Sequence, residues 1–360
     1  MSGGMEKMEK QFLKRFYGTL AAALLFAACI VILFDPFYHY HDAIGTMKHV
    51  LLDRDYQVAG TLDHFTYDAV LLGTSVAENN DLTQFSERFG ITAVKAIRAA
   101  GVNADFVVYL DRAFRHQQLK RVFYYIDYLS LESEVKTTFD RMDTKYVTNT
   151  NPFDDLKYLL NKDVLLKNVP LQLAYSYALP YDEANPYSWY ESKTFSTEAV
   201  KGRYYPMDAI SEERFDEAAW QNFKENLSMI TERVKAHPET KFDFVFSPVS
   251  ILWWDDAYRQ GLLEQKLSEL GEFVSTMGKY PNVTIHCFQN DQDMTENLDH
   301  YMDTVHFSYE INRRLCDRMA DETNVITAEN CQEYLDEIRQ MVEEFSREGI
   351  LKYYPEAVVR

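Results

Sequence analysis

The sequence predicts an α/β protein in which a parallel sheet carries helices on both faces, preceded by one membrane-spanning helix. Three observations support this. Five strand-like runs alternate with helical patterns, which is typical of parallel sheets. The first run is continuously apolar, as expected for a strand covered on both faces. An uncharged stretch, residues 16–34, precedes all of them.

The uncharged stretch is long enough to cross a bilayer. A helix of this length, at ~1.5 Å per residue, extends roughly 28 Å. Basic residues precede it, so the positive-inside bias predicts that residues 1–15 are cytoplasmic and that residues from 35 onward lie outside. A cleaved signal peptide is the alternative. Because Ile30–Phe34 continue the apolar run past Cys29, an uncleaved anchor is favoured.

The remaining elements follow in chain order. Residues 35–65 are expected to form a juxtamembrane connector with a helix over residues 43–55. A sheet-containing domain is expected over residues 66–330, with its strands at 69–72, 92–97, 121–127, 241–246 and 283–288. Its helices are expected near 103–116, 215–236, 262–277 and 309–321. The region 129–215, rich in Tyr, Asn, Asp and Pro, breaks the rhythm and is predicted to be an insertion, partly helical at 153–160. A helical tail, 331–360, ends the chain.

Composition excludes some functions. The chain has 360 residues and a formal net charge of -19. Nucleic acid is therefore an improbable partner, since phosphate contacts require an excess of Lys and Arg. Cys29 lies in the anchor, and the other three cysteines (Cys287, Cys316 and Cys331) are an odd number without CxxC spacing. They predict no metal site and no disulfide framework, and their pairing is left open.

A serine follows the first predicted strand. The segment from Val70 to Ser75 reads as a buried strand that runs into a Gly-x-Ser turn. Ligands bind open α/β folds at the carboxyl edge of the sheet, which is where Ser75 is expected to lie. Gly73 permits a tight approach of the backbone, and Ser75 is the candidate nucleophile. A serine that merely caps a helix is the alternative.

An acid and a base occur together near the other end of the chain. Asp303 lies three residues before His306, in a polar loop just before a predicted helix. His306 is the candidate base, because a serine hydroxyl needs a neighbouring imidazole to accept its proton. Asp303 is predicted to accept a hydrogen bond from Nδ1 of His306, which leaves Nε2 for Ser75. A helix-entry Asp with an incidental His is the alternative.

Three segments together resemble the SGNH (GDSL-like) hydrolase superfamily. They are VLLGTSVAEN, YMDTVHFS and FVFSPVSILWW, which begin at Val70, Tyr301 and Phe244 respectively. The chain is most similar to the membrane-anchored bacterial branch that modifies surface polysaccharides and teichoic acids, over roughly residues 68–319. The resemblance implies a flavodoxin-like three-layer fold. It also implies a Ser–His–Asp mechanism that uses no metal and no cofactor.

The resemblance is incomplete at the oxyanion hole. The superfamily supplies a Gly after the second strand and an Asn after the third. Gly101 fits the first position, but Asp127-Tyr128 stands where the Asn motif is expected. The backbone N–H groups of Ser75 and Gly101, with the amide of Asn103, Asn79 or Asn80, are the candidate donors. Losing one donor typically costs about a hundred- to a thousand-fold in rate.

These inferences predict an extracytoplasmic serine esterase or O-acyltransferase, held in the bacterial cell membrane by a single helix. Its expected substrate is an acetyl or similar small acyl group on a surface glycan or teichoic acid. A membrane-bound O-acyltransferase is an expected partner. Candidate substrate-binding aromatic residues are Tyr128, Trp253 and Trp254, since sugars stack on such rings.

Two alternatives stay open. The missing Asn favours a non-catalytic glycan-binding or assembly subunit on the same fold. A weaker alternative is a metal-dependent hydrolase that uses Asp291, Asp293, His300 and His306, although their spacing matches no recognised metal loop.

Overall fold

The computed structural model describes residues 2–139, 145–149 and 151–359, which divide into two compact units. Unit 1 contains Met1–Phe65 and Phe139–Glu183, and unit 2 contains Thr66–Thr138 and Ala184–Arg360. The region 129–215 is therefore not one insertion. Its middle part groups with the N-terminal residues, and its two ends belong to unit 2 with the helical tail. Residues 140–144 and 150 of that region lie outside the described part.

Unit 2 is built on one parallel sheet of five strands, as the sequence predicts. The strands are β1 (Ala69–Gly73), β2 (Ala93–Ile97), β3 (Arg121–Tyr125), β4 (Lys241–Phe246) and β5 (Val283–Cys287). Their order is β2-β1-β3-β4-β5, and every neighbouring pair is parallel. Every residue of β1 is buried, which explains its continuously apolar sequence.

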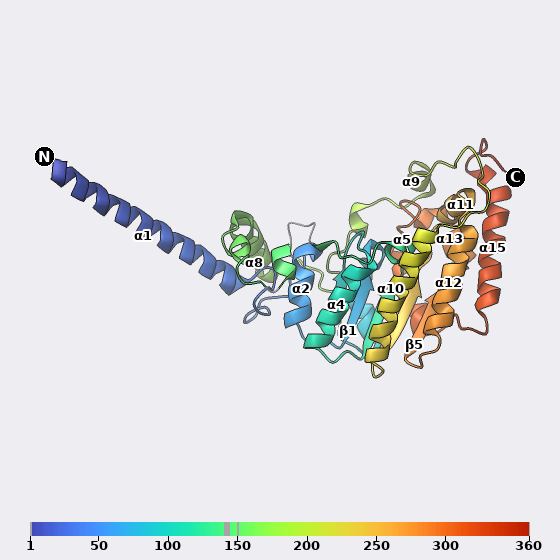
Figure 1. Cartoon of the computed structure of the whole chain (residues 1–360), viewed down its shortest axis with the longest axis horizontal. Coiled ribbons are helices and arrows are strands. Elements are labelled where there is room, and N and C mark those ends of the chain that lie inside the picture. Colours follow the sequence, from blue (N-terminus) through green and yellow to red (C-terminus); the bar gives the residue numbers. More distant parts are fainter. Residues whose placement is uncertain (1, 140–144, 150, 360) are drawn as a thin grey trace. The chain divides into compact units, whose positions relative to one another are not determined.

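Helices cover both faces of the sheet. The principal ones are α3 (Leu82–Phe89), α4 (Asn103–His116), α10 (Glu217–Ala236), α12 (Leu263–Met277) and α14 (Tyr309–Ala320). The chain moves in one direction from β1 to β2 and in the opposite direction from β2 through β3 and β4 to β5. Right-handed crossovers therefore put α3 on one face and α4, α10 and α12 on the other, where they lie side by side (Figure 1). On the first face, α14 packs against α3.

Shorter elements and the tail complete unit 2. They are η1 (Ser75–Ala77), α5 (Tyr128–Glu132), η4 (Tyr190–Ser192), α9 (Thr197–Lys201), α11 (Ile251–Arg259), α13 (Gln292–Thr295), η5 (Leu298–His300), α15 (Cys331–Arg347) and η6 (Gly349–Lys352). The tail helix α15 packs on α11 and α12 through a buried apolar face. All four cysteines fall within the described residues, and their thiols are free.

Unit 1 contains the long helix α1 (Ser2–Phe34) and several short helices. These are α2 (Arg54–His64), α6 (Lys145–Thr148), α7 (Leu156–Leu159), η3 (Val164–Asn168) and α8 (Val169–Tyr177). The stretch Met5–Phe34 is long and apolar enough to cross a membrane, a test that a signal sequence near the N-terminus also passes. Its orientation is an expectation from the flanking charges alone.

The helix predicted over residues 43–55 is wrong. Those residues are largely non-helical, and the helix begins only at Arg54. Gly45 adopts a left-handed conformation (φ +61°) that interrupts a helix, and Asp53 is the residue that starts one. Its side chain accepts a hydrogen bond from the N–H of Asp55, as an N-cap does.

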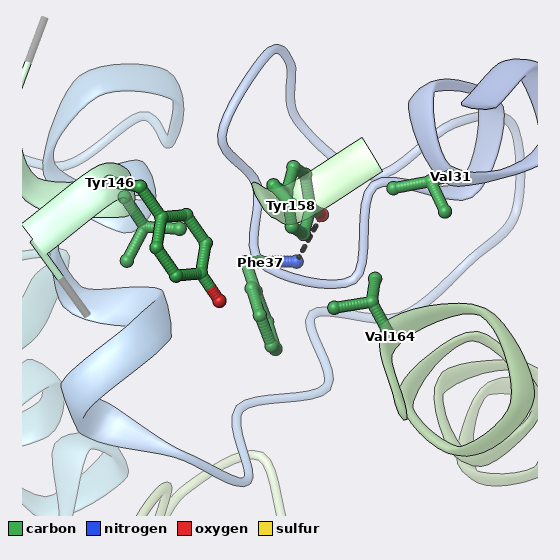
Figure 2. Close-up of a cluster of buried hydrophobic side chains, with 6 residues drawn as sticks. Val31, Phe37, Tyr146, Tyr158 and Val164 are labelled. Carbon is green, nitrogen blue, oxygen red and sulfur yellow. Dashed lines mark hydrogen bonds between the residues drawn. The ribbon is translucent and has the colours of Figure 1, made fainter. Parts of the chain in front are cut away.

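A small apolar core joins the two segments of unit 1 (Figure 2). Its buried members are Val31, Phe37, Tyr146, Val147, Tyr158 and Val164. The hydroxyl of Tyr158 donates to Asp35 Oδ1 at 2.7 Å and accepts from the N–H of Phe37 at 3.2 Å. The residues around 155–165 are therefore fixed directly to the carboxyl end of α1.

Candidate active site

The strand order reverses beside β1, and ligand sites of open α/β folds lie at such reversals. The chain proceeds from β1 to β2 on one side and then crosses to β3 on the other. The carboxyl ends of β1 and β3 therefore frame the switch point. Thr74 and Ser75 leave β1 there, and Asp127 leaves β3. The hydroxyl of Thr74 donates to Asp127 Oδ2 at 3.2 Å and joins the two strand ends.

A tight turn presents Ser75. The turn η1 is closed by the N–H of Ala77, which donates to the carbonyl of Thr74 at 3.1 Å. A Cβ at Gly73 would lie 2.9 Å from the Cβ of Tyr125 and 3.0 Å from that of Ala77, so only glycine fits there. Ser75 itself is half-buried. Its N–H opens the turn, a position that has no partner within the turn.

The structure brings Ser75, His306 and Asp303 together. Ser75 Oγ lies 2.7 Å from His306 Nε2, although the two residues are 231 positions apart. His306 Nδ1 lies 3.0 Å and 2.9 Å from the two carboxylate oxygens of Asp303. A carboxylate only accepts hydrogen bonds, so Nδ1 carries the ring proton and Nε2 accepts from the serine.

The loop that carries Asp303 and His306 is held firmly. Asp303 Oδ1 also accepts from the N–H groups of Val305 (2.9 Å) and His306 (2.8 Å). Burial alone raises the pKa of Asp303, but the hydrogen bonds from the ring and backbone of His306 outweigh it and lower the pKa below its usual value. Ser250 donates to the carbonyl of Thr304 from both its N–H (3.0 Å) and its hydroxyl (2.9 Å).

Trp189 packs over the reacting groups from a distant part of the chain. Its ring meets that of His306 edge to face, with centroids 5.5 Å apart and an interplanar angle of 83°. Its indole N–H donates to the carbonyl of Ser75 at 3.3 Å. Asn79 Oδ1 accepts from the N–H of Trp189 at 3.1 Å and fixes this arrangement. Arg203, about half-exposed, has its Nη1 3.6 Å from Asp303 Oδ2.

Two expected oxyanion donors are used elsewhere. The N–H of Gly101 donates to the carbonyl of Arg98 at 3.1 Å. Asn103 is fully buried, and its amide donates to Asn226 of α10 while its oxygen accepts from Tyr124. These contacts correct the expectation for both residues. Gly101 serves a tight turn in which a Cβ would meet Phe106 at 2.8 Å, and Asn103 serves the interior.

The two neighbouring asparagines also have structural contacts. Asn80 is buried, donates to the carbonyl of Ala77 at 2.8 Å and accepts from Tyr125 at 2.9 Å. Asn79 accepts from Trp189 through its Oδ1, whereas its Nδ2 is buried and donates to no described residue. Of the expected donors, the N–H of Ser75 and the Nδ2 of Asn79 therefore stay available.

Asp127 lies where the sequence resemblance leads one to expect an amide. It begins α5, and its Oδ1 accepts from the N–H of Leu129 at 3.0 Å. Burial raises the pKa of its carboxyl, although hydrogen bonds from Leu129 and Thr74 and the charge of His306 act in the opposite direction. The site thus contains two carboxyl groups whose surroundings push their pKa values apart.

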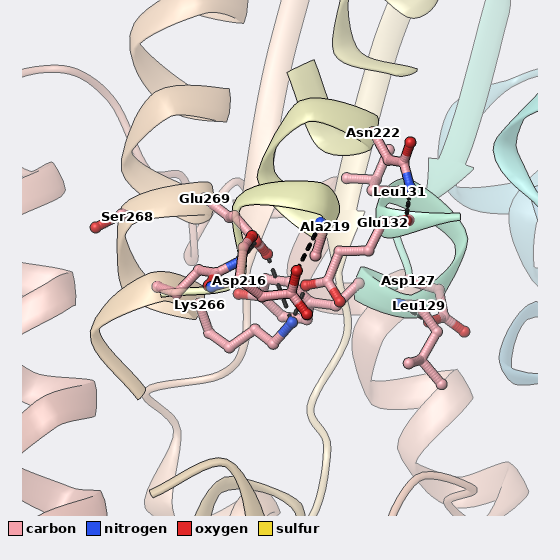
Figure 3. Close-up of polar contacts among 12 residues, drawn as sticks. Asp127, Leu129, Leu131, Glu132, Asp216, Ala219, Asn222, Lys266, Ser268 and Glu269 are labelled. Atoms are coloured by element: carbon pink, nitrogen blue, oxygen red, sulfur yellow. Dashed lines mark hydrogen bonds and ion pairs between the residues drawn. The ribbon is translucent and has the colours of Figure 1, made fainter. Parts of the chain in front are cut away.

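A polar cluster behind the site holds α5 in place (Figure 3). Lys266 of α12 forms ion pairs with Glu132 of α5 and with Glu269, the latter at 3.8 Å. Burial lowers the pKa of Lys266 and raises that of Glu269. Asn222 of α10 donates to the carbonyl of Glu132 at 2.9 Å. Two helices of one face therefore fix the short helix that starts at Asp127.

A small cavity of about 40 Å³ is lined in part by the turn and the loop that carry the reacting groups. Val76 and Val305, the neighbours of Ser75 and His306, line it, together with Asp127, Tyr128 and Trp253. Tyr128 stacks on Trp253 with centroids 5.3 Å apart and an interplanar angle of 22°. Trp254 is fully buried, which corrects its expected role in substrate binding. The cavity volume is on the order of one or two water molecules, so it suits a very small group.

Asp291 and His300, two of the residues considered for a metal site, have other contacts. Asp291 caps α13 by accepting from Met294 and forms an ion pair with Arg318. The carbonyl of His300 accepts from the N–H of Ser308. Within residues 2–139, 145–149 and 151–359, no group of three or more His, Cys, Asp or Glu side chains is placed to hold a metal ion.

Comparison with known proteins gives little beyond the fold. No protein-family model and no curated protein matches the chain. The chain is similar to a solved structure from Streptococcus pneumonia described as a candidate platelet activating factor. That similarity covers 75% of this chain and 90% of the other, at 11% identity and a TM-score of 0.38. So distant a likeness carries no functional argument. What the coordinates themselves define is an open α/β protein with a Ser–His–Asp arrangement at its switch point.

Three residues of the site are weakly marked in the sequence. Trp189 carries no local signal, because nothing near residue 189 links it to residue 306. Asp127 was noticed as a departure from a motif, and its position just after a strand was the signal that marked it. Ser250 carried no recognisable signal.

Proposed function

We propose that this protein is a serine esterase or O-acyltransferase for small acyl groups. The observation that carries the proposal is the continuous chain of short contacts from Ser75 Oγ through His306 to Asp303. Its geometry matches the roles of nucleophile, base and orienting acid. Its location at the carboxyl edge of a parallel sheet, beside a cavity, also supports the proposal.

In the first half of the reaction, Ser75 Oγ attacks the acyl carbonyl and His306 Nε2 takes the hydroxyl proton. Asp303 stays ionised and holds the resulting imidazolium. The tetrahedral intermediate collapses, the ester C–O bond breaks, and the leaving alcohol takes the proton from His306. The product of this half is an acyl–serine ester.

In the second half, water or a sugar hydroxyl attacks the acyl–serine, and His306 accepts its proton and then returns it to Ser75. The N–H of Ser75 is the first candidate to stabilise the oxyanion. The arrangement therefore serves hydrolysis and transfer equally.

The small cavity supports an acetyl-sized group in preference to a long chain. The sequence resemblance supports a surface glycan or teichoic acid as the carrier of that group, and a membrane-bound O-acyltransferase as a partner. The apolar helix Met5–Phe34 supports attachment to the bacterial membrane, with unit 2 on the outer side.

Replacing the proposed nucleophile tests the mechanism directly. Ser75→Ala is expected to abolish hydrolysis of p-nitrophenyl acetate and labelling by a fluorophosphonate probe, because the attacking oxygen is removed. Ser268→Ala removes an exposed serine hydroxyl of α12 and serves as the matched control, which should behave as the wild type. Wild-type turnover by Ser75→Ala would refute the mechanism.

A non-catalytic binding subunit is the second candidate. It is favoured by the engagement of the Gly101 N–H and the Asn103 amide, which leaves few donors for an oxyanion. Saturable binding of an acetylated glycan by the wild-type protein, without probe labelling or release of acetate, would select this alternative.

A further inference from the structure

We propose that a set of exposed apolar side chains in unit 1, here called the apolar rim, lies in the lipid bilayer beside the last turns of α1. The rim would make unit 1 a membrane-embedded collar rather than a simple linker. Its members, all large and exposed, are Phe153, Leu156, Leu160, Leu166, Tyr177 and Leu179.

Two members of the rim, Leu156 of α7 and Leu166 of η3, belong to elements that pack on α1, and α8, which ends at Tyr177, packs on η3. Both α7 and η3 lie against α1, and Val164 of η3 shares the buried cluster with Val31 of α1 (Figure 2). Val31 is fully buried, whereas Leu25 and Phe26, less than two turns earlier, are exposed. Unit 1 therefore covers only the carboxyl end of a helix that is otherwise bare.

The position of this contact sets the depth of the rim. Val31 lies three residues before the end of α1, which is about 4.5 Å along the helix axis. If Met5–Phe34 spans a bilayer, its partner η3 lies at the boundary of headgroups and acyl chains, where interfacial helices bury their apolar faces by roughly 5–10 Å.

The exposure of the rim is otherwise unexplained. Phe153 is 86% exposed and Leu166 is 73% exposed. Large apolar side chains that recur along one exposed segment are unfavourable in water and mark an interaction surface. The short helix η3 has a buried side and an exposed side. Val164 is in the protein core, and Leu166 faces outward.

Charge favours lipid as the occupant. Lys157, Lys162 and Lys167 are exposed and alternate with the rim residues along the chain. Lysine stems lie along apolar surface while their ammonium groups reach the headgroups, and they are attracted to anionic lipid. Two acids of the same stretch have partners within unit 1, since Asp154 accepts from Asn149 and Asp155 contacts His39 and Tyr40. Asp163 is exposed, so three lysines face one exposed acid there.

Tryptophan fluorescence in vesicles tests the proposal on the full chain. Leu166→Trp and Phe153→Trp each place one reporter in the rim, and emission of the parent protein is subtracted. The vesicles contain phosphatidylcholine and phosphatidylglycerol, with or without bromine on the acyl chains. Leu25→Trp, in the bare part of α1, is the positive control for lipid contact. The soluble amide of tryptophan is the reference for aqueous iodide.

Both rim reporters are expected to lose about half of their emission in brominated lipid, as suits interfacial burial, and to resist iodide. Quenching by iodide as in the soluble amide, without an effect of bromine, would overturn the proposal and would point to a rim open to water or to a protein partner. Failure of Leu25→Trp to respond to bromine would overturn it as well, because α1 would then not lie in lipid. Neither result depends on the ester chemistry, which the Ser75 variant tests separately.

Discussion

At the residue scale, the site contrasts two carboxyl groups. Asp303 accepts three hydrogen bonds from Val305 and His306, which lower its pKa and keep it ionised beside the imidazole. Asp127 is pushed the other way by burial. Pairs of titratable groups with opposed environments are how active sites divide charged and neutral roles. Asp127 therefore keeps its proton to a higher pH than an ordinary carboxyl group does, and only its protonated form could donate to an oxyanion.

Asp127→Asn tests this division. An amide has the same shape and donates without any dependence on pH. Its single oxygen can keep the contact with the N–H of Leu129, and the hydroxyl of Thr74 can then accept from the amide NH2. Because one oxyanion donor is worth about a hundred-fold or more, the variant is expected to raise kcat/KM for an acetyl ester at neutral pH by roughly ten-fold.

The dependence of kcat/KM on pH shows in which direction the charge of Asp127 acts. In the wild type, Asp127 ionises as pH rises through its elevated pKa, so its negative charge increasingly opposes the oxyanion. In Asp127→Asn, kcat/KM is expected not to decline at high pH, whereas its rise with pH on the acidic side of the profile should be unchanged. A ten-fold loss of kcat/KM in Asp127→Asn at every pH would show that the carboxyl itself is needed.

At the element scale, one buried charge group ties three strands together. Asp243 of β4 accepts from Arg121 of β3 at 2.6 and 2.9 Å, and its Oδ1 lies 3.1 Å from His286 Nε2 of β5. Asp243 and His286 are fully buried. Burial raises the pKa of Asp243, but its bonds to His286 and Arg121 outweigh this and lower it below the usual value.

Asp243→Asn is expected to lower the free energy of unfolding by about 3 kcal/mol at pH 7, because it leaves the Arg121 guanidinium, which is only 15% exposed, without its counter-charge. The measurement is urea unfolding of unit 2, followed by tryptophan emission. Asp208→Asn, at an exposed position, is the control and should change little.

The same pair of variants carries a pH prediction. Because the folded pKa of Asp243 is depressed, its contribution is complete above the unfolded carboxyl value of about 4 and is lost as pH falls through the folded value. The difference between wild type and Asp243→Asn should therefore shrink on acidification. An equal difference at pH 7 and well below pH 4 would contradict this account.

At the scale of the whole molecule, the chain forms two compact units whose sequences interleave. Unit 1 is complete only when the segment Phe139–Glu183 packs against the N-terminal segment. The hydrogen bonds of Tyr158 with Asp35 and Phe37 connect the two segments. Each unit has its own core, so we expect each to unfold as its own cooperative transition.

Tyr158→Phe removes the hydroxyl from the core of unit 1. Losing a hydrogen bond to a charged group costs about 1.5–3 kcal/mol, so calorimetry in detergent micelles should show the transition of unit 1 at lower temperature and that of unit 2 unchanged. Tyr177→Phe, at an exposed position, is the control. A single transition that shifts as a whole would mean that the units do not unfold separately.

Local patterns predicted much of the sheet and of the reacting set. The strand at 69–72 was found from a continuous apolar run and the strand at 241–246 from the alternation of strands with helices, whereas Ser75 was found from its position after a strand and the Asp303–His306 pair from its spacing. The helix at 43–55 was misplaced because an apolar-polar pattern does not reveal that Gly45 turns left-handed and that Asp53 caps the next helix. The division of residues 129–215 between two units was also missed, since contact partners far along the chain leave no local trace.

By itself, the sequence determined the parallel α/β class, the apolar N-terminal helix and the presence of a hydroxyl, an imidazole and a carboxylate suited to acyl transfer. Periodicity and turn chemistry act over a few residues, so these features are legible in the order of amino acids. Only the tertiary structure decided that Ser75 meets His306 across 231 positions, that Trp189 packs against both, and that Gly101 and Asn103 serve other contacts. Contacts between residues so far apart in sequence depend on the order of the strands and the handedness of the crossovers. Both are properties of the folded chain as a whole.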